Sequence, residues 1–177
     1  MSNDKFKAGD LFPSISLNTL SHGILKIGEP IDNNDWQMVV VYRGKHCPMC
    51  TSYLRKLESL KNSFYDIGIS IIAVSGDPEN KATDHNQEME LSFPVAYDLS
   101  IEQMKELGLY ISHPRSPQET DRPFAEPGIY IINEKGQVQV TDISNAPFTR
   151  PELETLAGGL SFIRKPENNY PIRGTFE

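Results

Sequence analysis

The chain of 177 residues has 17 lysines and arginines against 24 aspartates and glutamates, which gives a formal net charge of −7 at pH 7. Hydrophobic residues make up 38% and charged residues 23%, as in an ordinary globular protein, and the length suits one domain spanning residues 1–177. The acidic balance argues against nucleic acid and anionic lipid as partners. Two cysteines are too few for a small disulfide scaffold.

No segment has the pattern of a targeting or membrane sequence. Residues Met1–Lys7 contain neither the apolar core nor the small-residue cleavage pattern of a secretory signal. The longest apolar run, Met38–Tyr42, is far shorter than the roughly 20 residues that a membrane helix needs. We therefore expect a cytoplasmic protein that does not associate with membranes.

The first half of the chain predicts a buried strand followed by an amphipathic helix. Residues Leu11–Leu25 mix apolar residues with turn formers, which is typical of short edge strands or extended loop. The run Met38–Tyr42 is continuous and rich in valine, so it predicts a strand buried on both faces. After the breaker segment Arg43–His46, apolar residues recur with the helical period from Pro48 to about Gly68. The apolar stripe of this helix is Tyr53, Leu54, Leu57, Leu60 and Phe64.

Strands and helices continue to alternate as far as a long loop. We predict strands over Ile69–Val74 and Phe93–Tyr97, and helices over Glu79–Met89 and Ile101–Leu107. The proline-rich segment His113–Pro127 is expected to be a loop, and loops of this length often carry function.

The C-terminal part predicts a hairpin and a last helix. A strand over Ile129–Ile132 and a returning strand around Val138–Val140 flank a turn. The last helix is expected over Thr149–Ile163 with Thr149 as its cap, and a polar tail begins at about Lys165. Because strands alternate with helices, we predict an α/β fold around a largely parallel sheet, which the hairpin makes mixed.

The motif Cys47-Pro48-Met49-Cys50, called the redox motif below, lies between the end of a buried strand and the start of a helix. Active sites of α/β sheets lie at the carboxyl ends of strands. The positive end of the helix favours a cysteine thiolate, which is the reactive form, and Arg43, Lys45 and a protonated His46 would add positive charge. We therefore predict Cys47 as the exposed nucleophile and Cys50 as the more buried resolving partner.

Two other interpretations of the cysteine pair remain open. The pair could be inert and buried, or it could be half of a zinc site. No second cysteine pair is present and no histidines have paired spacing, so redox chemistry is favoured over zinc. The histidines that a zinc site would have to use are His22, His46, His85 and His113.

Several segments together resemble a known family. They are Ala8–Leu17, Val39–Gly44 with the redox motif, Ala73–Asp77, Phe93–Asp98 and Glu126–Asn133. This arrangement resembles the thioredoxin superfamily, and most closely its peroxiredoxin-like branch, the alkyl hydroperoxide reductase and thiol-specific antioxidant group. The resemblance implies a thioredoxin-like fold with a central mixed sheet flanked by helices, and antioxidant thiol chemistry.

The resemblance also implies roles for single residues. Pro127 would be the cis-proline that packs against the redox motif. Phe124 would line the approach of the substrate, and Tyr42 would either line it or belong to the core.

The chain departs from the family at informative positions. Typical peroxiredoxins have a proline and a threonine where this chain has Val40 and Gly44, and an arginine from the facing strand where it has Pro127. Arg43 or Arg122 is a possible substitute for that arginine. Thioredoxins have a buried acid where this chain has Val41.

Other polar residues are weaker candidates. Asp77 and Asp98 follow strands, where turn or capping roles are commoner than acid chemistry. His85 is expected on the solvated surface of a polar helix, and His113 in the loop is a possible gating residue.

Three functions follow, in order of preference. In the first, Cys47 reduces a hydroperoxide, forms a sulfenic acid, and then a disulfide with Cys50 that an external thiol such as a thioredoxin or glutathione system reduces. In the second, the same residues reduce disulfides. In the third, the pair is a non-enzymatic redox sensor. No metal or other cofactor is expected, and a homodimer is possible.

Overall fold

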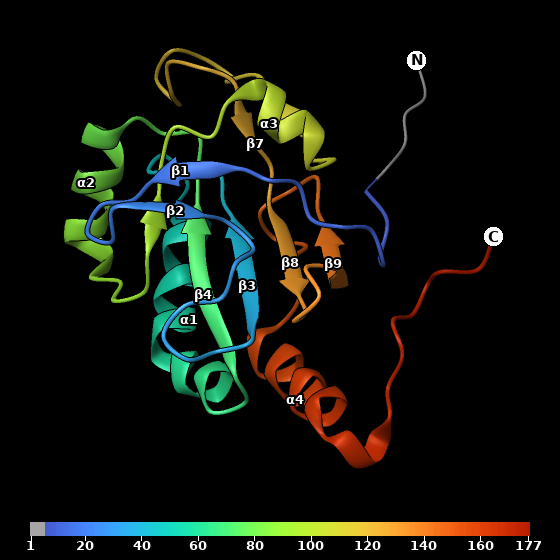
Figure 1. The fold of residues 1–177 in the computed structure, drawn as a ribbon. Coiled ribbons are helices and arrows are strands. Elements are labelled where there is room, and N and C mark those ends of the chain that lie inside the picture. The colour runs from blue at the N-terminus through green and yellow to red at the C-terminus, as the bar shows by residue number, and fades with distance from the viewer. Residues whose placement is uncertain (1–5) are drawn as a thin grey trace.

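The computed structural model describes residues 6–177, so residues 1–5 of the expected domain lie outside the described part. Its centre is a five-stranded sheet in the order β5-β4-β3-β8-β9 (Figure 1). The central strand β3 pairs in parallel with β4 and antiparallel with β8, so the predicted mixed sheet is confirmed. The strands are β3 (Trp36–Val41), β4 (Ile69–Val74), β5 (Val95–Ala96), β8 (Gly128–Ile132) and β9 (Val138–Ile143).

Four α-helices and two small antiparallel sheets surround this centre. The helices are α1 (Pro48–Tyr65), α2 (Glu79–Met89), α3 (Ile101–Glu106) and α4 (Leu153–Arg164), followed by a 3-10 turn over Pro166–Asn168. One small sheet pairs β1 (Ser16–Asn18) with β2 (Ile24–Lys26), and the other pairs β6 (Ile111–Ser112) with β7 (Phe124–Ala125). None of the helices in residues 6–177 has the length and apolar character needed to cross a bilayer.

The central strands are buried on both faces because successive side chains point to opposite sides of the sheet. Val40 and Ile71 join the apolar layer under α1 and α4. Val39 and Ile72 join the opposite layer, which the β1–β2 hairpin and α3 cover. Figure 1 shows the hairpin and α1 on opposite sides of the sheet. The sheet thus fixes where β3 ends and α1 begins, which is where the redox motif lies.

Most predicted elements of the central sheet and its helices agree with the observed ones, but the expected loop His113–Pro127 contains strand β7, the strand expected over Phe93–Tyr97 is reduced to Val95–Ala96, and the start of the last helix differs. Strand β4 and helix α2 have the predicted bounds, and β3 begins two residues earlier than expected. The prediction that Thr149 caps α4 is wrong. The cap is Glu152, whose carboxylate accepts hydrogen bonds from the backbone N–H groups of Glu154 and Thr155. A carboxylate at this position also complements the positive end of the helix.

Candidate active site

Cys47 is the residue that begins helix α1. It occupies the N-cap position, and its Sγ accepts a hydrogen bond from the backbone N–H of Cys50 at 3.2 Å. Pro48 takes the first helical position, where its missing N–H costs nothing. The prediction that Cys47 is exposed is wrong, because its side chain turns back onto its own helix and is only 2% exposed. Cys50 is fully buried, as expected of the inner partner.

The pKa values of the two cysteine thiols are shifted in opposite directions. The Cys50 thiol acts as a hydrogen-bond donor and, with the Cys50 backbone N–H and Arg43, lowers the pKa of Cys47 to about 6 against the opposing effect of burial. The hydrogen bond to Cys47 and then burial raise the pKa of Cys50, whereas the charge of Arg150 opposes that rise. The two shifts together favour a thiolate on Cys47 and a thiol on Cys50.

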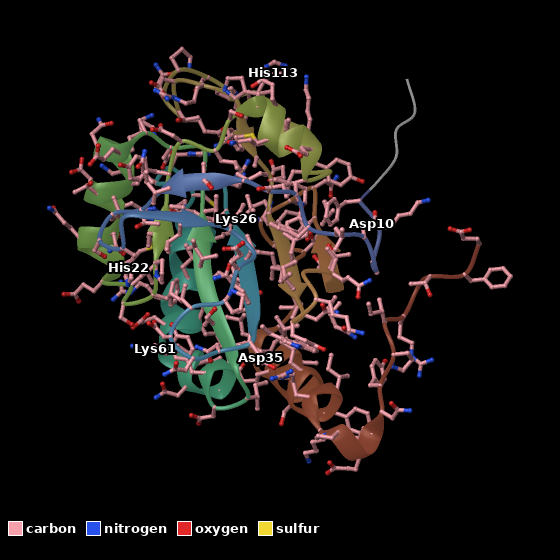
Figure 2. The ribbon with its side chains drawn as sticks, in the orientation of Figure 1. Asp10, His22, Lys26, Asp35, Lys61 and His113 are labelled. Carbon is pink, nitrogen blue, oxygen red and sulfur yellow. The ribbon has the colours of Figure 1, made fainter. Side chains whose placement is uncertain are left out.

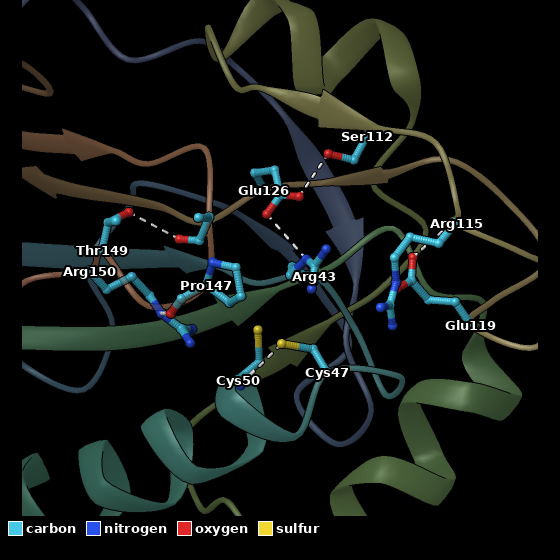
Figure 3. Close-up of polar contacts among 11 residues, drawn as sticks. Arg43, Cys47, Cys50, Ser112, Arg115, Glu119, Glu126, Pro147, Thr149 and Arg150 are labelled. Atoms are coloured by element: carbon cyan, nitrogen blue, oxygen red, sulfur yellow. Dashed lines mark hydrogen bonds and ion pairs between the residues drawn. The ribbon is translucent and has the colours of Figure 1, made fainter.

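Arg43 is the cation closest to this thiolate. Its guanidinium lies over the ring of Phe124, with Cζ 4.6 Å from the ring centroid. Its Nε forms an ion pair of 3.1 Å with the buried carboxylate of Glu126, whose other oxygen accepts a hydrogen bond of 2.7 Å from the Ser112 hydroxyl (Figure 3). The pairing with Glu126 holds the guanidinium above Cys47. Sequence reasoning did not single out Glu126, although an acid inside an apolar run was a visible signal.

Arg122, the other arginine considered from the sequence, forms its ion pair away from the redox motif. Arg122 pairs with the adjacent Asp121 at the surface, and Asp121 also pairs with Lys81. Of the two arginines, therefore, the structure brings Arg43 next to Cys47 and leaves Arg122 at the surface.

Pro127 is buried but is not a cis-proline, so that expectation is wrong: residues 6–177 contain no cis peptide bond. The chain stays extended between β7 and β8. The N–H of Glu126 donates to the carbonyl of Tyr110, and the carbonyl of Pro127 accepts from the N–H of Ser144. These two bonds continue the pairing of the strands on either side, and a trans bond is the usual form before proline.

Tyr42 and His46, both expected at the site, lie in different surroundings. Tyr42 is completely buried in the core, where burial raises the pKa of its hydroxyl. His46 is half-buried with its ring 4.5 Å from that of Phe124. Burial lowers the pKa of His46; the charge of Asp77 opposes this effect and that of Arg43 adds to it, so the net shift is against the protonated His46 that would have added positive charge.

His85 contradicts its predicted place on the surface, because it is completely buried beside the redox motif. Its Nε2 lies 2.7 Å from the hydroxyl of Thr51 in the first part of α1. The inward face of α2 consists of Ala82, His85 and Met89. Their spacing of three and four residues places them on one side of a helix, so the sequence contained a signal that His85 is buried. His22 and His113, by contrast, lie at the surface (Figure 2).

On the other side of α1, an open groove of about 520 Å³ adjoins the redox motif. Arg150, which sequence reasoning missed, stacks its guanidinium on the ring of Tyr53 at 4.2 Å and donates from Nε to the carbonyl of Pro147. Phe148 and Met49 are the exposed apolar residues of this groove. The full lining is Pro48, Met49, Ser52, Tyr53, Lys56, Pro147, Phe148 and Arg150. Within residues 6–177, no three His, Cys, Asp or Glu side chains are grouped as metal ligands would be.

Comparisons with solved structures agree on the fold. A peroxiredoxin 6 of Arenicola marina superposes with a TM-score of 0.77 at 17% identity, over 92% of this chain and 75% of that one. The peroxidoxin BcpB from Mycobacterium tuberculosis has a TM-score of 0.73 at 16% identity, over 90% and 99% of the two chains. PrxQ of Xylella fastidiosa has a TM-score of 0.70 at 13% identity, over 92% and 99%. These similarities confirm the predicted thioredoxin-like fold of the peroxiredoxins.

The family of the chain is established by a match of its sequence to a family profile. No curated protein matches the chain significantly. The profile of the AhpC/TSA family, however, matches residues 8–141, which is well over half of the chain and includes both cysteines, Arg43 and Glu126. The chain therefore belongs to the AhpC/TSA family and is a thiol-dependent oxidoreductase of the peroxiredoxin type.

Proposed function

We propose that the protein reduces hydroperoxides with Cys47 as the nucleophile and Cys50 as the resolving cysteine. The observation that carries the proposal is the place of Cys47 at the N-cap of α1, where Sγ accepts a hydrogen bond from the Cys50 N–H and lies beside the Arg43 guanidinium; these contacts lower its pKa to about 6. Only the thiolate is an effective nucleophile, so this cysteine is reactive at neutral pH whereas Cys50 is held as a thiol.

In the first step, the Cys47 thiolate attacks the terminal oxygen of the hydroperoxide. A sulfur–oxygen bond forms as the O–O bond breaks, the alkoxide leaves and takes a proton from water, and Cys47 is oxidised to a sulfenic acid. Negative charge moves from sulfur to oxygen during this step. The fixed guanidinium of Arg43 is placed to stabilise that charge, because its pairing with Glu126 pre-orients it.

In the second step, Cys50 condenses with the oxidised Cys47. The thiol of Cys50 loses its proton, its sulfur attacks Cys47 Sγ, and the oxygen leaves as water. This step is supported by the hydrogen bond from the Cys50 backbone N–H to Cys47 Sγ, which holds the nucleophile within one helical turn of Cys50. An external thiol donor, such as a thioredoxin or glutathione system, then supplies the two electrons that reopen the disulfide.

The direct test is stopped-flow oxidation of the reduced protein by hydrogen peroxide. We expect a second-order rate constant well above that of free cysteine, lost in Cys47→Ser and retained in Cys50→Ser. Mass spectrometry should then find a disulfide in the wild type and a sulfenic acid in Cys50→Ser. A wild-type rate no faster than free cysteine would contradict the proposal.

Disulfide reduction is the second candidate, and it is favoured by one observation. The residues that typical peroxiredoxins use before the nucleophile are replaced by Val40 and Gly44, whereas the Cys-x-x-Cys pair lies at a helix start. Reduction of insulin that disappears in Cys47→Ser, together with slow oxidation by peroxide, would support this candidate instead.

A further inference from the structure

The segment Gly44–Thr51, which carries the redox motif, is held at both ends by buried polar side chains from one neighbouring stretch of chain. We propose that these side chains, Asp77 and His85, are positioning residues that set the orientation of Cys47 without touching the substrate. This inference rests on the proposed role of Cys47, but it is tested below by a property that needs no substrate.

Asp77 holds the beginning of the segment. It follows β4, is 4% exposed, and accepts a hydrogen bond of 2.8 Å from the backbone N–H of Lys45. The hydroxyl of Ser75 accepts a bond from the Asp77 N–H and so fixes the turn that presents the carboxylate. A carboxylate bound to a backbone N–H is among the stronger hydrogen bonds in proteins. The position of Asp77 therefore fixes the peptide two residues before Cys47.

Gly44 explains why this contact exists here. Its φ is +133°, and a Cβ at this position would lie 2.7 Å from both carboxylate oxygens of Asp77. Any larger residue would push the carboxylate away, including the threonine that typical peroxiredoxins have at this position. The glycine and Asp77 thus form a matched pair, in which the carboxylate occupies the space that a side chain at position 44 would need.

His85 holds the end of the segment. The Thr51 hydroxyl donates to the carbonyl of Cys47 at 3.3 Å and lies 2.7 Å from His85 Nε2. A hydroxyl has one proton to give. When Thr51 uses that proton on Cys47, His85 must be the donor in the shorter bond. In this arrangement the proton of the contact lies on Nε2, and the burial that lowers the pKa of His85 favours the neutral ring.

The two contacts bracket the thiolate. One fixes the backbone before Cys47, and the other fixes the Cys47 carbonyl through Thr51. Between them, Cys47 Sγ must point at the Cys50 N–H, 3.2 Å away, and toward Arg43. Loosening either end would weaken the interactions that stabilise the thiolate, so Asp77 and His85 should affect the acidity of Cys47 although neither is part of the redox motif.

The test is titration of the Cys47 thiolate by its absorbance at 240 nm in the reduced protein. We expect the pKa of Cys47 to rise toward its ordinary value in His85→Leu and in Asp77→Ala, and the rate with peroxide at pH 7 to fall roughly tenfold. In His85→Gln the amide N–H can still donate to Thr51, so that variant should restore most of both. Replacement of the surface residue His22 by leucine is the control and should change neither.

Thr51→Val removes the hydroxyl that connects His85 to the Cys47 carbonyl. It should raise the pKa of Cys47 as His85→Leu does, and combining the two should add little, because both break one connection. A wild-type pKa of Cys47 in Thr51→Val or in a folded His85→Leu would overturn the proposal for His85, as would a His85→Gln variant whose pKa is as high as that of His85→Leu. A wild-type value in Asp77→Ala would overturn the proposal for Asp77. Slow peroxide oxidation of the wild type with these pKa shifts intact would instead contradict the proposed peroxidase function alone.

Discussion

The two sides of the active-site turn differ sharply. On one side, the turn that carries Cys47 is held by buried polar contacts: the Arg43–Glu126 ion pair, the bond that Asp77 accepts from the Lys45 N–H, and the contact of His85 with Thr51. On the other side is an open groove in which Phe148 is 72% exposed. The difference suggests a division of labour, in which the closed side fixes the charge and orientation of the thiolate and the groove leaves room for other molecules. Substitutions on the closed side should therefore change the chemistry of Cys47, whereas those in the groove should not.

The largest effect is expected from Arg43→Gln on the closed side. Loss of the guanidinium removes the charge that stabilises the developing oxyanion, and the rate constant with hydrogen peroxide should fall by roughly 100-fold. It also leaves the carboxylate of Glu126 buried and unpaired, so the free energy of unfolding should fall by about 3 kcal/mol. Stopped-flow oxidation and urea unfolding measure the two effects.

The double variant Arg43→Gln with Glu126→Gln separates them. A neutral amide at position 126 can still accept from Ser112, so stability should largely return while the rate stays low. If the double variant regained the wild-type rate, the role of Arg43 in stabilising charge would be wrong.

A smaller effect is expected from Arg150→Gln at the edge of the groove. The charge of Arg150 opposes the rise in the pKa of Cys50, so its removal should make Cys50 harder to deprotonate and slow disulfide closure several-fold. The first step, which uses Cys47, should stay within about twofold of the wild type. Rapid quenching with alkylation and mass spectrometry follows both steps.

Lys56 offers a matched control in the same groove. Its charge is already paired with Glu152 and Glu154, so Lys56→Gln should leave closure unchanged. Equal slowing in the two variants would show that net charge in the groove, rather than the place of Arg150, controls the second step.

The smallest effect is expected from Phe148→Ser. The side chain is largely exposed, so the free energy of unfolding should change by no more than about 0.5 kcal/mol. The rate with hydrogen peroxide should equal that of the wild type, as stopped-flow measurement would show. A large loss of either would mean that the groove wall supports the redox motif, and the contrast between the two sides would fail.

The fold was largely predictable because its signals are local. The apolar run Ile69–Val74 and the pattern of Glu79–Met89 gave the bounds of β4 and α2 directly. Placement of the redox motif at a strand–helix junction followed from the same patterns, since periodicity changes at Pro48.

The contacts around the thiolate were not predictable because they join residues far apart in sequence. Glu126 reaches Arg43 from the link between β7 and β8, and His85 reaches Thr51 from another helix. Their partners depend on how the layers pack. The wrong expectations for Cys47, His46 and His85 share one cause: the sequence shows polarity, whereas burial decides which of these side chains face solvent or hold a proton.

The most direct test of the central claim is the thiolate titration of the wild type, Cys47→Ser and Cys50→Ser. A group with a lowered pKa loses its charge only at low pH, so the wild-type absorbance at 240 nm should fall as the pH drops through about 6. The same transition should persist in Cys50→Ser, where the serine hydroxyl can still donate to Cys47, and vanish in Cys47→Ser. A transition near the ordinary thiol value of about 8.5, or one that survives in Cys47→Ser, would contradict the account.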